Sequence, residues 1–209
     1  MAALALVYAL GALVILPLDL DDSPEAGPPV RRAVAPRPPA PVPDSAALEQ
    51  AVLRRYAHRP LARVFRRRTG DAEAADRIAR ALLAEARRLE VAPSLLAAVV
   101  LTENARLDPD TVSAQGATGL MQVMPFHAGE YGCGSDDLTQ VEGNICHGAR
   151  VFGRYLRAAR TLSEALLRYN GCVSGTNTPG CRQYPERVLR VAGEVRREVL
   201  LYGRGAAGT

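Results

Sequence analysis

The residue best suited to acid–base chemistry in this sequence is Glu103, which closes an uninterrupted apolar stretch. Residues 95–101 read Leu-Leu-Ala-Ala-Val-Val-Leu, and a pattern that is apolar on every face predicts a helix buried all round. A carboxyl group at the C-terminal end of such a helix meets apolar surroundings and the negative end of the helix dipole, and both raise its pKa. Glu103 is therefore a candidate general acid. The alternative is a buried glutamate neutralised by an arginine, without a chemical role.

Polar residues that could contact a ligand recur at three later places. Residues 113–125 read Ser-Ala-Gln-Gly-Ala-Thr-Gly-Leu-Met-Gln-Val-Met-Pro; two glycines bracket a tight turn, and a short apolar helical turn ends at the proline. Gln122 is a single amide in this apolar strip, so it is either a hydrogen-bonded core group or a ligand contact. Asn144 lies just before an apolar helical run, and Tyr-Asn-Gly at residues 169–171 closes another.

Taken in order, these motifs resemble the soluble-lytic-transglycosylase (SLT) domain, a family of lytic transglycosylases with a lysozyme-like fold. The family pattern is a glutamate, a proline, Ser-x-x-Gly-Ala-x-Gly-Leu-Met-Gln-x-Met-Pro, Asn-Ile-x-x-Gly and Tyr-Asn-Gly. Here these elements are Glu103, Pro109, residues 113–125, Asn144-Ile145 with Gly148, and residues 169–171. The resemblance covers about residues 91–203 and predicts a mainly α, lysozyme-like catalytic domain with irregular loops.

The resemblance also implies a role for each matching residue. Glu103 would be the catalytic acid/base. The side chains expected to line a glycan groove are those of Ser113, Gln122, Met124, Asn144 and Tyr169, with Tyr169 closest to the glutamate. Asn170 belongs to the same substrate-binding set, and its expected task is to hold the loop.

The sequence departs from the family pattern just after the glutamate. The family usually has Glu-Ser-x-Phe-x-Pro, whereas this chain has Glu-Asn-Ala-Arg-Leu-Asp-Pro at residues 103–109. Counted back from the proline, Asn104 falls on the catalytic position, and one inserted residue after Glu103 restores the match. We accept the insertion because Glu103 is the only acid between Glu90 and Asp108. Asn104 replaces the usual serine and can still hydrogen-bond the carboxyl group.

A single carboxyl group suggests chemistry in which the substrate supplies the nucleophile. Glycoside hydrolysis normally uses two carboxyl groups on opposite sides of the bond, but no second acid lies inside an apolar motif as Glu103 does. The resemblance implies that Glu103 protonates the glycosidic oxygen between N-acetylmuramic acid (MurNAc) and N-acetylglucosamine (GlcNAc). The N-acetyl group would stabilise the cationic centre, and the sugar's 6-hydroxyl would close a 1,6-anhydro ring. No cofactor and no metal is expected.

Two other functions stay open at this point. In a lysozyme-type peptidoglycan hydrolase, Asp108 or Asp110 would position a water molecule. In a catalytically silent peptidoglycan-binding module, which the shifted glutamate motif allows, the groove would only hold glycan strands. Nucleic acid is not the expected partner, because the arginines at 54–55 and 66–68 are more simply solvated helix faces. The net charge of +4 suits an anionic polymer without identifying it.

Helical periodicity predicts the elements that position these residues. Ser94 is expected to cap the helix that ends at Glu103, and Tyr184-Pro185 opens a last helix with Gly203 past its end. Two earlier stripes have helical spacing, with a proline at 60 and a break at 70–71 between them. They are Leu48, Val52 and Tyr56, and then Ile78, Leu82, Ala86 and Leu89.

The four cysteines predict two local disulfides. They contain no Cys-x-x-Cys motif, and no histidine is spaced from them as in a zinc site. An even count after an export signal favours disulfides, with Cys133 paired to Cys146 and Cys172 paired to Cys181. Free, buried cysteines are the alternative.

The N-terminal part predicts export to the cell envelope or periplasm. Residues 2–18 carry no charge, which fits a secretory signal or, as we favour, an uncleaved membrane anchor; a buried core helix is the alternative. A Pro-rich stretch follows, whose expected conformation is extended. The predicted organisation is an anchor at 1–18, a linker at 19–43, a helical N-terminal extension at 44–90, the catalytic domain at 91–203 and a tail at 204–209.

Overall fold

The computed structural model describes residues 44–172 and 180–206. The predicted anchor at 1–18 and the linker at 19–43 lie outside the described residues. Among the helices that are described, none combines the length and the apolar character needed to cross a bilayer.

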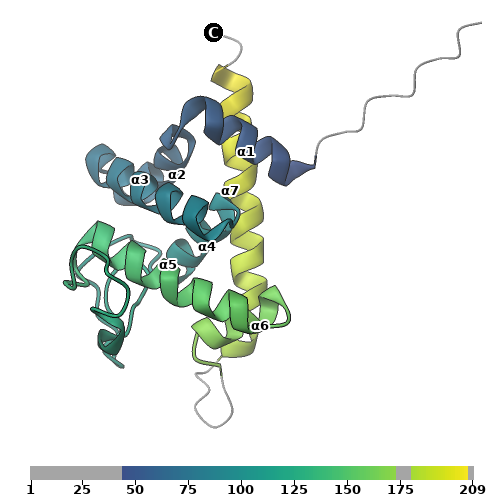
Figure 1. Ribbon diagram of the computed structural model, residues 1–209. Helices are drawn as coiled ribbons and strands as arrows, with labels where there is room; N and C mark the ends of the chain where they lie inside the picture. The colour runs from purple at the N-terminus through teal and green to yellow at the C-terminus, as the bar shows by residue number, and fades with distance from the viewer. Residues whose placement is uncertain (1–43, 173–179, 207–209) are drawn as a thin grey trace, which may run out of the picture. The chain divides into compact units, whose positions relative to one another are not determined.

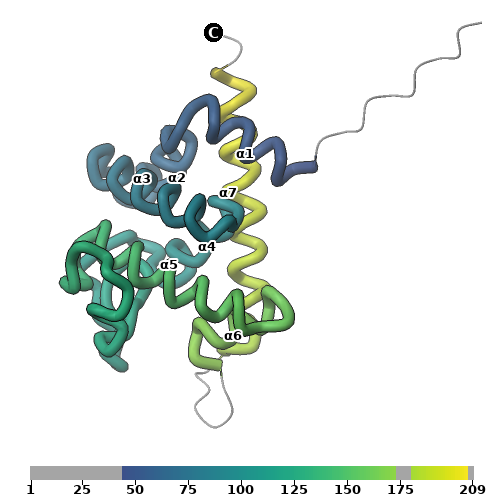
Figure 2. Tube along the Cα trace, viewed as in Figure 1, coloured from purple at the N-terminus to yellow at the C-terminus, as the bar shows by residue number. Residues whose placement is uncertain are grey.

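The described chain is built from seven α-helices, and its predicted mainly α class is confirmed. Figures 1 and 2 show these helices with a long irregular segment between α4 and α5. That segment contains two isolated β-bridges and, among the residues described, no strand forms. The elements are α1 (Ser45–Tyr56), α2 (Arg59–Thr69), α3 (Ala72–Leu89), α4 (Pro93–Glu103), η1 (Pro125–His127), α5 (Val141–Ala158), α6 (Leu162–Tyr169), η2 (Cys181–Gln183) and α7 (Tyr184–Ala206).

Helix α7 is the longest element and contacts helices from both ends of the chain. It packs against α4 and α6 as well as α1 and α2. Figure 1 shows its first turns beside α6 and its last turns beside α1 and α2. Helix α3 packs against α2, α4 and α5, so the segment predicted as an N-terminal extension shares its packing with the later helices.

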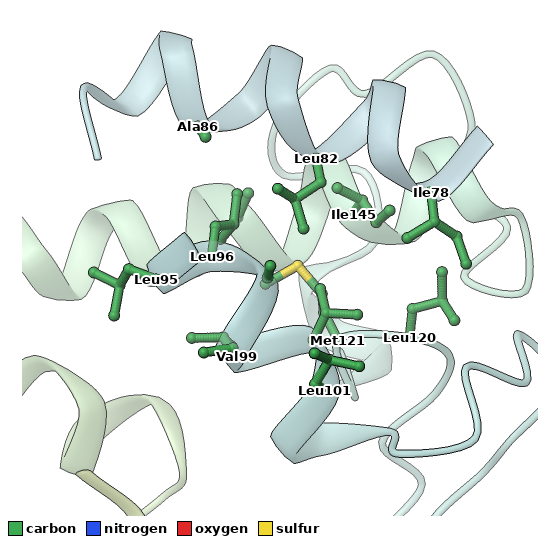
Figure 3. Close-up of a cluster of buried hydrophobic side chains, with 14 of the residues drawn as sticks. Ile78, Leu82, Ala86, Leu95, Leu96, Val99, Leu101, Leu120, Met121 and Ile145 are labelled. Atoms are coloured by element: carbon green, nitrogen blue, oxygen red, sulfur yellow. The ribbon is translucent and has the colours of Figure 1, made fainter. Parts of the chain in front are cut away.

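Helix α4 lies in the middle of the hydrophobic core, as its apolar pattern predicts. Every residue from Pro93 to Leu101 is buried. Helices α7 and α3 pack against it, and side chains of α5 and the irregular segment belong to the same core; Figure 3 shows Met121 among Leu82, Val99 and Ile145. Because an apolar helix gains stability from burial on all sides, this packing holds the end of α4 in one place.

The N-terminal end of α4 is capped by a neighbouring helix and not by Ser94, so that prediction was wrong. The helix begins at Pro93, one residue before Ser94. The carboxylate of Glu49 in α1 instead accepts hydrogen bonds from the Ser94 backbone N–H at 2.7 Å and from its hydroxyl at 2.8 Å. Arg196 of α7 pairs with the same carboxylate at 3.0 Å. A buried carboxylate therefore satisfies one free N–H group at the positive end of the helix.

Three other local predictions need correction. Helix α5 begins at Val141, so Asn144 lies inside it. Helix α7 continues through Gly203 to Ala206. Gly203 packs directly against Val52 of α1, and a Cβ added at this position would lie 2.7 Å from the valine side chain. The glycine therefore serves helix packing and does not end the helix. The chain before Pro125 is not helical, because Gln122 has a φ of 47°, in the left-handed region.

Candidate active site

The carboxyl group of Glu103 lies in a pocket of about 370 Å³ at the end of α4. The structure brings five of the sequence-predicted residues to this pocket with it. They are Ser113, Gln122, Met124, Tyr169 and Asn170, and the remaining lining residues are Gln115, Ala117 and Gly171. The pocket thus collects residues from α4, from the irregular segment and from the end of α6.

Burial raises the pKa of Glu103 to about 7. The residue is partly exposed at the pocket, but protein atoms surround its carboxyl group, which disfavours the charged form. Two neighbours oppose this effect and lower the pKa, first the hydrogen bond from Tyr184 and then the positive charge of Arg187. Near neutral pH, Glu103 can therefore hold a proton and can also give it up, as a general acid and base must.

Tyr184 is the residue that the sequence analysis did not assign to the site. Its hydroxyl donates a hydrogen bond to Glu103 Oε1 at 2.5 Å. Burial and the nearby carboxylate raise the pKa of Tyr184 well above its ordinary value, so the phenol stays neutral and remains a donor. With Oε1 held in this way, Oε2 is the oxygen left to carry a transferable proton.

No sequence motif points to Tyr184, because it lies 81 residues from Glu103 along the chain. The contact exists because the end of α4 packs against α7 and Tyr184 is the first residue of α7. The one available signal was its position at the predicted start of the last helix.

Tyr169, expected to be closest to Glu103, forms a wall of the pocket, and its hydroxyl is bonded elsewhere. The hydroxyl donates to the backbone oxygen of Met121 at 2.8 Å. Its ring meets Phe152 edge to face, with 5.6 Å between centroids. Burial and the charge of Glu103 raise the pKa of Tyr169 well above its ordinary value. These contacts fix the ring as a rigid surface beside the carboxyl group.

Gln122 lines the pocket, and the nitrogen end of its amide is bonded to the backbone. Its Nε2 donates to the backbone oxygens of Gly119 at 3.0 Å and Thr111 at 3.3 Å, which identifies the nitrogen end of the amide. Its left-handed backbone, uncommon for a residue other than glycine, is held at a pocket wall. Strained conformations of this kind cluster at functional sites.

Asn170 also lines this pocket. Its Oδ1 is buried and forms no hydrogen bond with any residue that the structure describes, although Asn170 lines the pocket. Buried polar atoms normally have partners, but this oxygen is shielded from the pocket's solvent, so Asn170 lines the pocket without offering it to a ligand. Ser113 differs, because its hydroxyl accepts from the backbone N–H of Ala117 at 3.0 Å and holds the adjacent turn.

The structure does not bring Asn144 into the pocket. Its side chain is fully buried and is hydrogen-bonded to the backbone of the Gly-Leu-Met-Gln loop. Oδ1 accepts from the Met121 N–H at 2.7 Å, and Nδ2 donates to the oxygens of Thr118 and Leu138, each at 2.8 Å. Both N–H groups of the amide and its oxygen are bonded to backbone groups. Asn144 therefore supports the pocket without lining it.

Two glycines let this loop approach α5 closely. A Cβ on Gly119 would overlap the Asn144 side chain, and a Cβ on Gly148 would lie 2.5 Å from the Cβ of Met121. Gly119 also has a positive φ of 79°, which glycine adopts at little cost. The Asn-Ile-x-x-Gly and Gly-Leu-Met-Gln motifs therefore interlock as one structural unit.

Asn104 does not bond the Glu103 carboxyl group. Its Nδ2 donates to the backbone oxygens of Asp108 at 2.7 Å and Gly119 at 3.3 Å, and its Oδ1 accepts from the Asp108 N–H. The side chain is buried and ties the loop after α4 to the Gly-Leu-Met-Gln loop. Glu103, and not Asn104, faces the pocket.

A second pocket extends the site on the far side of Tyr169. It has a volume of about 160 Å³ and shares Gln122, Met124, Tyr169 and Gly171 with the first. Phe126, which is 67% exposed, lies on its rim. The two pockets therefore lie next to each other and share these four walls.

Both predicted disulfides are present. Cys133 is joined to Cys146, and Cys172 to Cys181. The second links the chain after α6 to η2, immediately before Tyr184. It therefore ties the chain just after Tyr169 to the start of α7, where Tyr184 contacts Glu103.

Glu103 is the only carboxyl group that lines this pocket among the residues described. Asp108 and Asp110 are exposed on the loop after α4. Glu130 pairs with His127 at 2.7 Å, and Glu142 pairs with Arg77 at 2.7 Å. No second acid is therefore placed opposite Glu103 in the described structure.

Comparison with known proteins agrees with this geometry. Residues 80–183 match the family described as the Transglycosylase SLT domain. A protein of Enterobacteria phage PRD1 named "Transglycosylase" is 37% identical over 100 residues, which are 47% of this chain and 36% of that relative. The chain thus spans about a third of the length of the relative that it matches.

Proposed function

Since residues 80–183 belong to the transglycosylase SLT domain family, we propose that this protein is a lytic transglycosylase of peptidoglycan. It cleaves the β-1,4 bond between MurNAc and GlcNAc and leaves 1,6-anhydroMurNAc ends. The observation that supports this reaction is the Glu103 carboxyl group, the only one that lines the pocket among the described residues, with a pKa raised to about 7.

In the first step, Glu103 acts as the acid. Its proton passes to the glycosidic oxygen while the bond from that oxygen to C1 of MurNAc breaks. The carbonyl oxygen of the substrate's own N-acetyl group bonds to C1 and takes the place of a second protein carboxylate. Gln122 lines the pocket with its amide nitrogen already bonded to backbone oxygens, so its amide oxygen is the group proposed to hold the sugar during this step.

In the second step, the resulting carboxylate acts as the base. It removes the proton from the 6-hydroxyl of MurNAc, and O6 bonds to C1 as the acetyl oxygen leaves. The carboxyl group regains its proton and no water is consumed. Tyr184 donates to Oε1 in both steps, so it orients the carboxyl group and stabilises its charged form between them.

The chemical form of the new MurNAc end, anhydro or reducing, distinguishes this reaction from hydrolysis. A hydrolase would place a water molecule with a second carboxylate, and Asp108 and Asp110 are exposed outside the pocket. Digestion of purified sacculi should release muropeptides lighter by one water than hydrolytic products and unreactive to borohydride. Reducible ends from the wild-type protein, absent with Glu103→Gln, would establish hydrolysis and overturn the lyase assignment.

We propose that the protein acts in the cell envelope, exported and held at the membrane by its N-terminal segment. Two disulfides suit an oxidising compartment, and residues 2–18 carry no charge. Fractionation of cells producing the full-length protein should place it with the envelope. Recovery in the cytosolic fraction would contradict this location.

Replacing Tyr184 with phenylalanine should shift the pH profile of the enzyme. The hydrogen bond from Tyr184 lowers the pKa of Glu103, so its loss raises that pKa. The alkaline limb of kcat/KM should move upward by about one pH unit, and activity on the plateau should fall about tenfold as the carboxyl group loses its orientation. A pH series on solubilised glycan strands measures both effects.

Tyr202→Phe is the matched control for this change. It removes a hydroxyl from the other end of α7 and should leave the profile unmoved. An alkaline limb at the wild-type position in Tyr184→Phe would mean that Tyr184 only packs against α4.

A further inference from the structure

Helix α2 presents a pocket rich in arginine far from the glycan site. The pocket has a volume of about 300 Å³ and is lined by Arg59, Arg63 and Arg66 of α2, with Tyr202 of α7 beside them. We refer to it as the arginine pocket. The sequence of α2 contains five arginines and no acid, so the helix offers a concentrated positive surface.

The three arginines of the pocket are not neutralised by the described parts of the chain. Within residues 44–172 and 180–206, none of them forms an ion pair, whereas the neighbouring Arg67 pairs with Glu198 at 2.7 Å. Asp76 also lines the pocket, but His58 at 2.6 Å and Arg80 at 2.5 Å hold its carboxylate.

The guanidinium of Arg63 lies 6.0 Å from the centre of the Tyr202 ring. Guanidinium groups bind phosphate through paired N–H donors. Three of them around one hollow make phosphate the ligand chemistry that fits.

An apolar pocket adjoins the arginine pocket. It has a volume of about 410 Å³ between α1 and α7, and its walls include Leu48, Val52 and Leu200. Tyr56 lines it and meets Tyr202 of the arginine pocket edge to face, with 5.5 Å between the ring centres. Arginine, tyrosine and aliphatic side chains side by side are typical of surfaces that enter the head-group region of a bilayer.

We propose that the arginine pocket and the adjoining apolar pocket form a docking surface for an anionic phospholipid bilayer. The arginines bind lipid phosphates, and the apolar pocket takes the hydrocarbon next to them. A nucleic acid would supply phosphates but would leave the apolar pocket unused. The chain also carries an uncharged segment at residues 2–18, connected to α1 through residues 19–43, which provides a second point of contact with a bilayer.

The position of this surface on α7 leaves the glycan site free. Tyr202 lies 18 residues after Tyr184, about 27 Å along the helix at 1.5 Å per residue. Figure 1 shows α1 and α2 beside the last turns of α7, whereas α6 lies beside the first turns. A protein docked through the arginine pocket would hold its Glu103 pocket away from the bilayer.

Vesicle binding by the full-length chain tests the docking surface. The triple variant Arg59→Gln, Arg63→Gln, Arg66→Gln should bind vesicles containing roughly a third phosphatidylglycerol about 100-fold more weakly than the wild type. Both proteins should bind phosphatidylcholine vesicles equally, since residues 2–18 are the same in each. The triple variant should also keep wild-type activity on sacculi, so this test stands apart from the proposed reaction.

The matched control removes the same charge elsewhere. Arg87, Arg157 and Arg197 are exposed arginines outside both pockets that form no ion pair with a described residue, and changing all three to glutamine should reduce anionic binding less than about threefold. Equal losses in the two triple variants would overturn the proposal, because net charge alone would then explain binding. It would also fail if a short DNA duplex displaced the protein at a lower phosphate concentration than the anionic vesicles.

Discussion

Glu103→Gln should lower turnover on purified sacculi by about 10² to 10⁴-fold. Glutamine keeps the size of the side chain and an oxygen for the Tyr184 hydroxyl, so the pocket should keep its shape. It has no proton to give to the glycosidic oxygen and cannot take one from the 6-hydroxyl. Release of anhydro-muropeptides, followed over time, measures the loss.

Asp108→Asn and Asp110→Asn are the controls for this experiment. Both residues are exposed and outside the pocket, so each variant should retain activity within about twofold of the wild type. Wild-type turnover in Glu103→Gln would remove Glu103 from the chemistry. A large loss in either aspartate variant would indicate a second carboxyl group and therefore hydrolysis.

Glu103→Gln should also make the protein more stable at pH 8 than the wild type. The fold raises the pKa of Glu103 from 4.5 to about 7, so the folded state binds a proton more tightly than the unfolded state. Below pH 4.5 both states are protonated and Glu103 has no pH-linked effect. Between pH 4.5 and 7 the wild type loses stability as pH rises, and above pH 7 the loss reaches about 3 kcal/mol.

The test is a comparison of the free energies of unfolding at pH 4 and pH 8. Glutamine cannot ionise, so the advantage of the variant should be small at pH 4 and reach about 3 kcal/mol at pH 8. Glu130→Gln is the control, because a hydrogen bond with His127 lowers the pKa of Glu130, and its removal should give no such gain at pH 8. An advantage of Glu103→Gln that did not change with pH would mean that Glu103 is not kept protonated by burial.

The amino-acid sequence by itself determined most of the helices and the buried position of the carboxyl group that we propose to be catalytic. The stripes from Leu48 to Leu89 and the apolar run before Glu103 predict the helices that form, because helical periodicity is a local property. The Gly-Leu-Met-Gln motif and the two disulfides were also predictable, because the residues that form each of them are close along the chain. The environment of Glu103 was predictable as well, since its apolar neighbours precede it directly.

Only the tertiary structure decided which polar side chains face the pocket. Asn144 and Gln122 both lie among apolar residues in the sequence, yet Asn144 bonds three backbone groups inside the core and Gln122 lines the pocket. The contact of Tyr184 with Glu103 and the junction of Tyr56 with Tyr202 depend on how α7 packs against α4 and α1. Such contacts join segments far apart in the chain, and the sequence pattern of one segment does not identify the segment against which it packs.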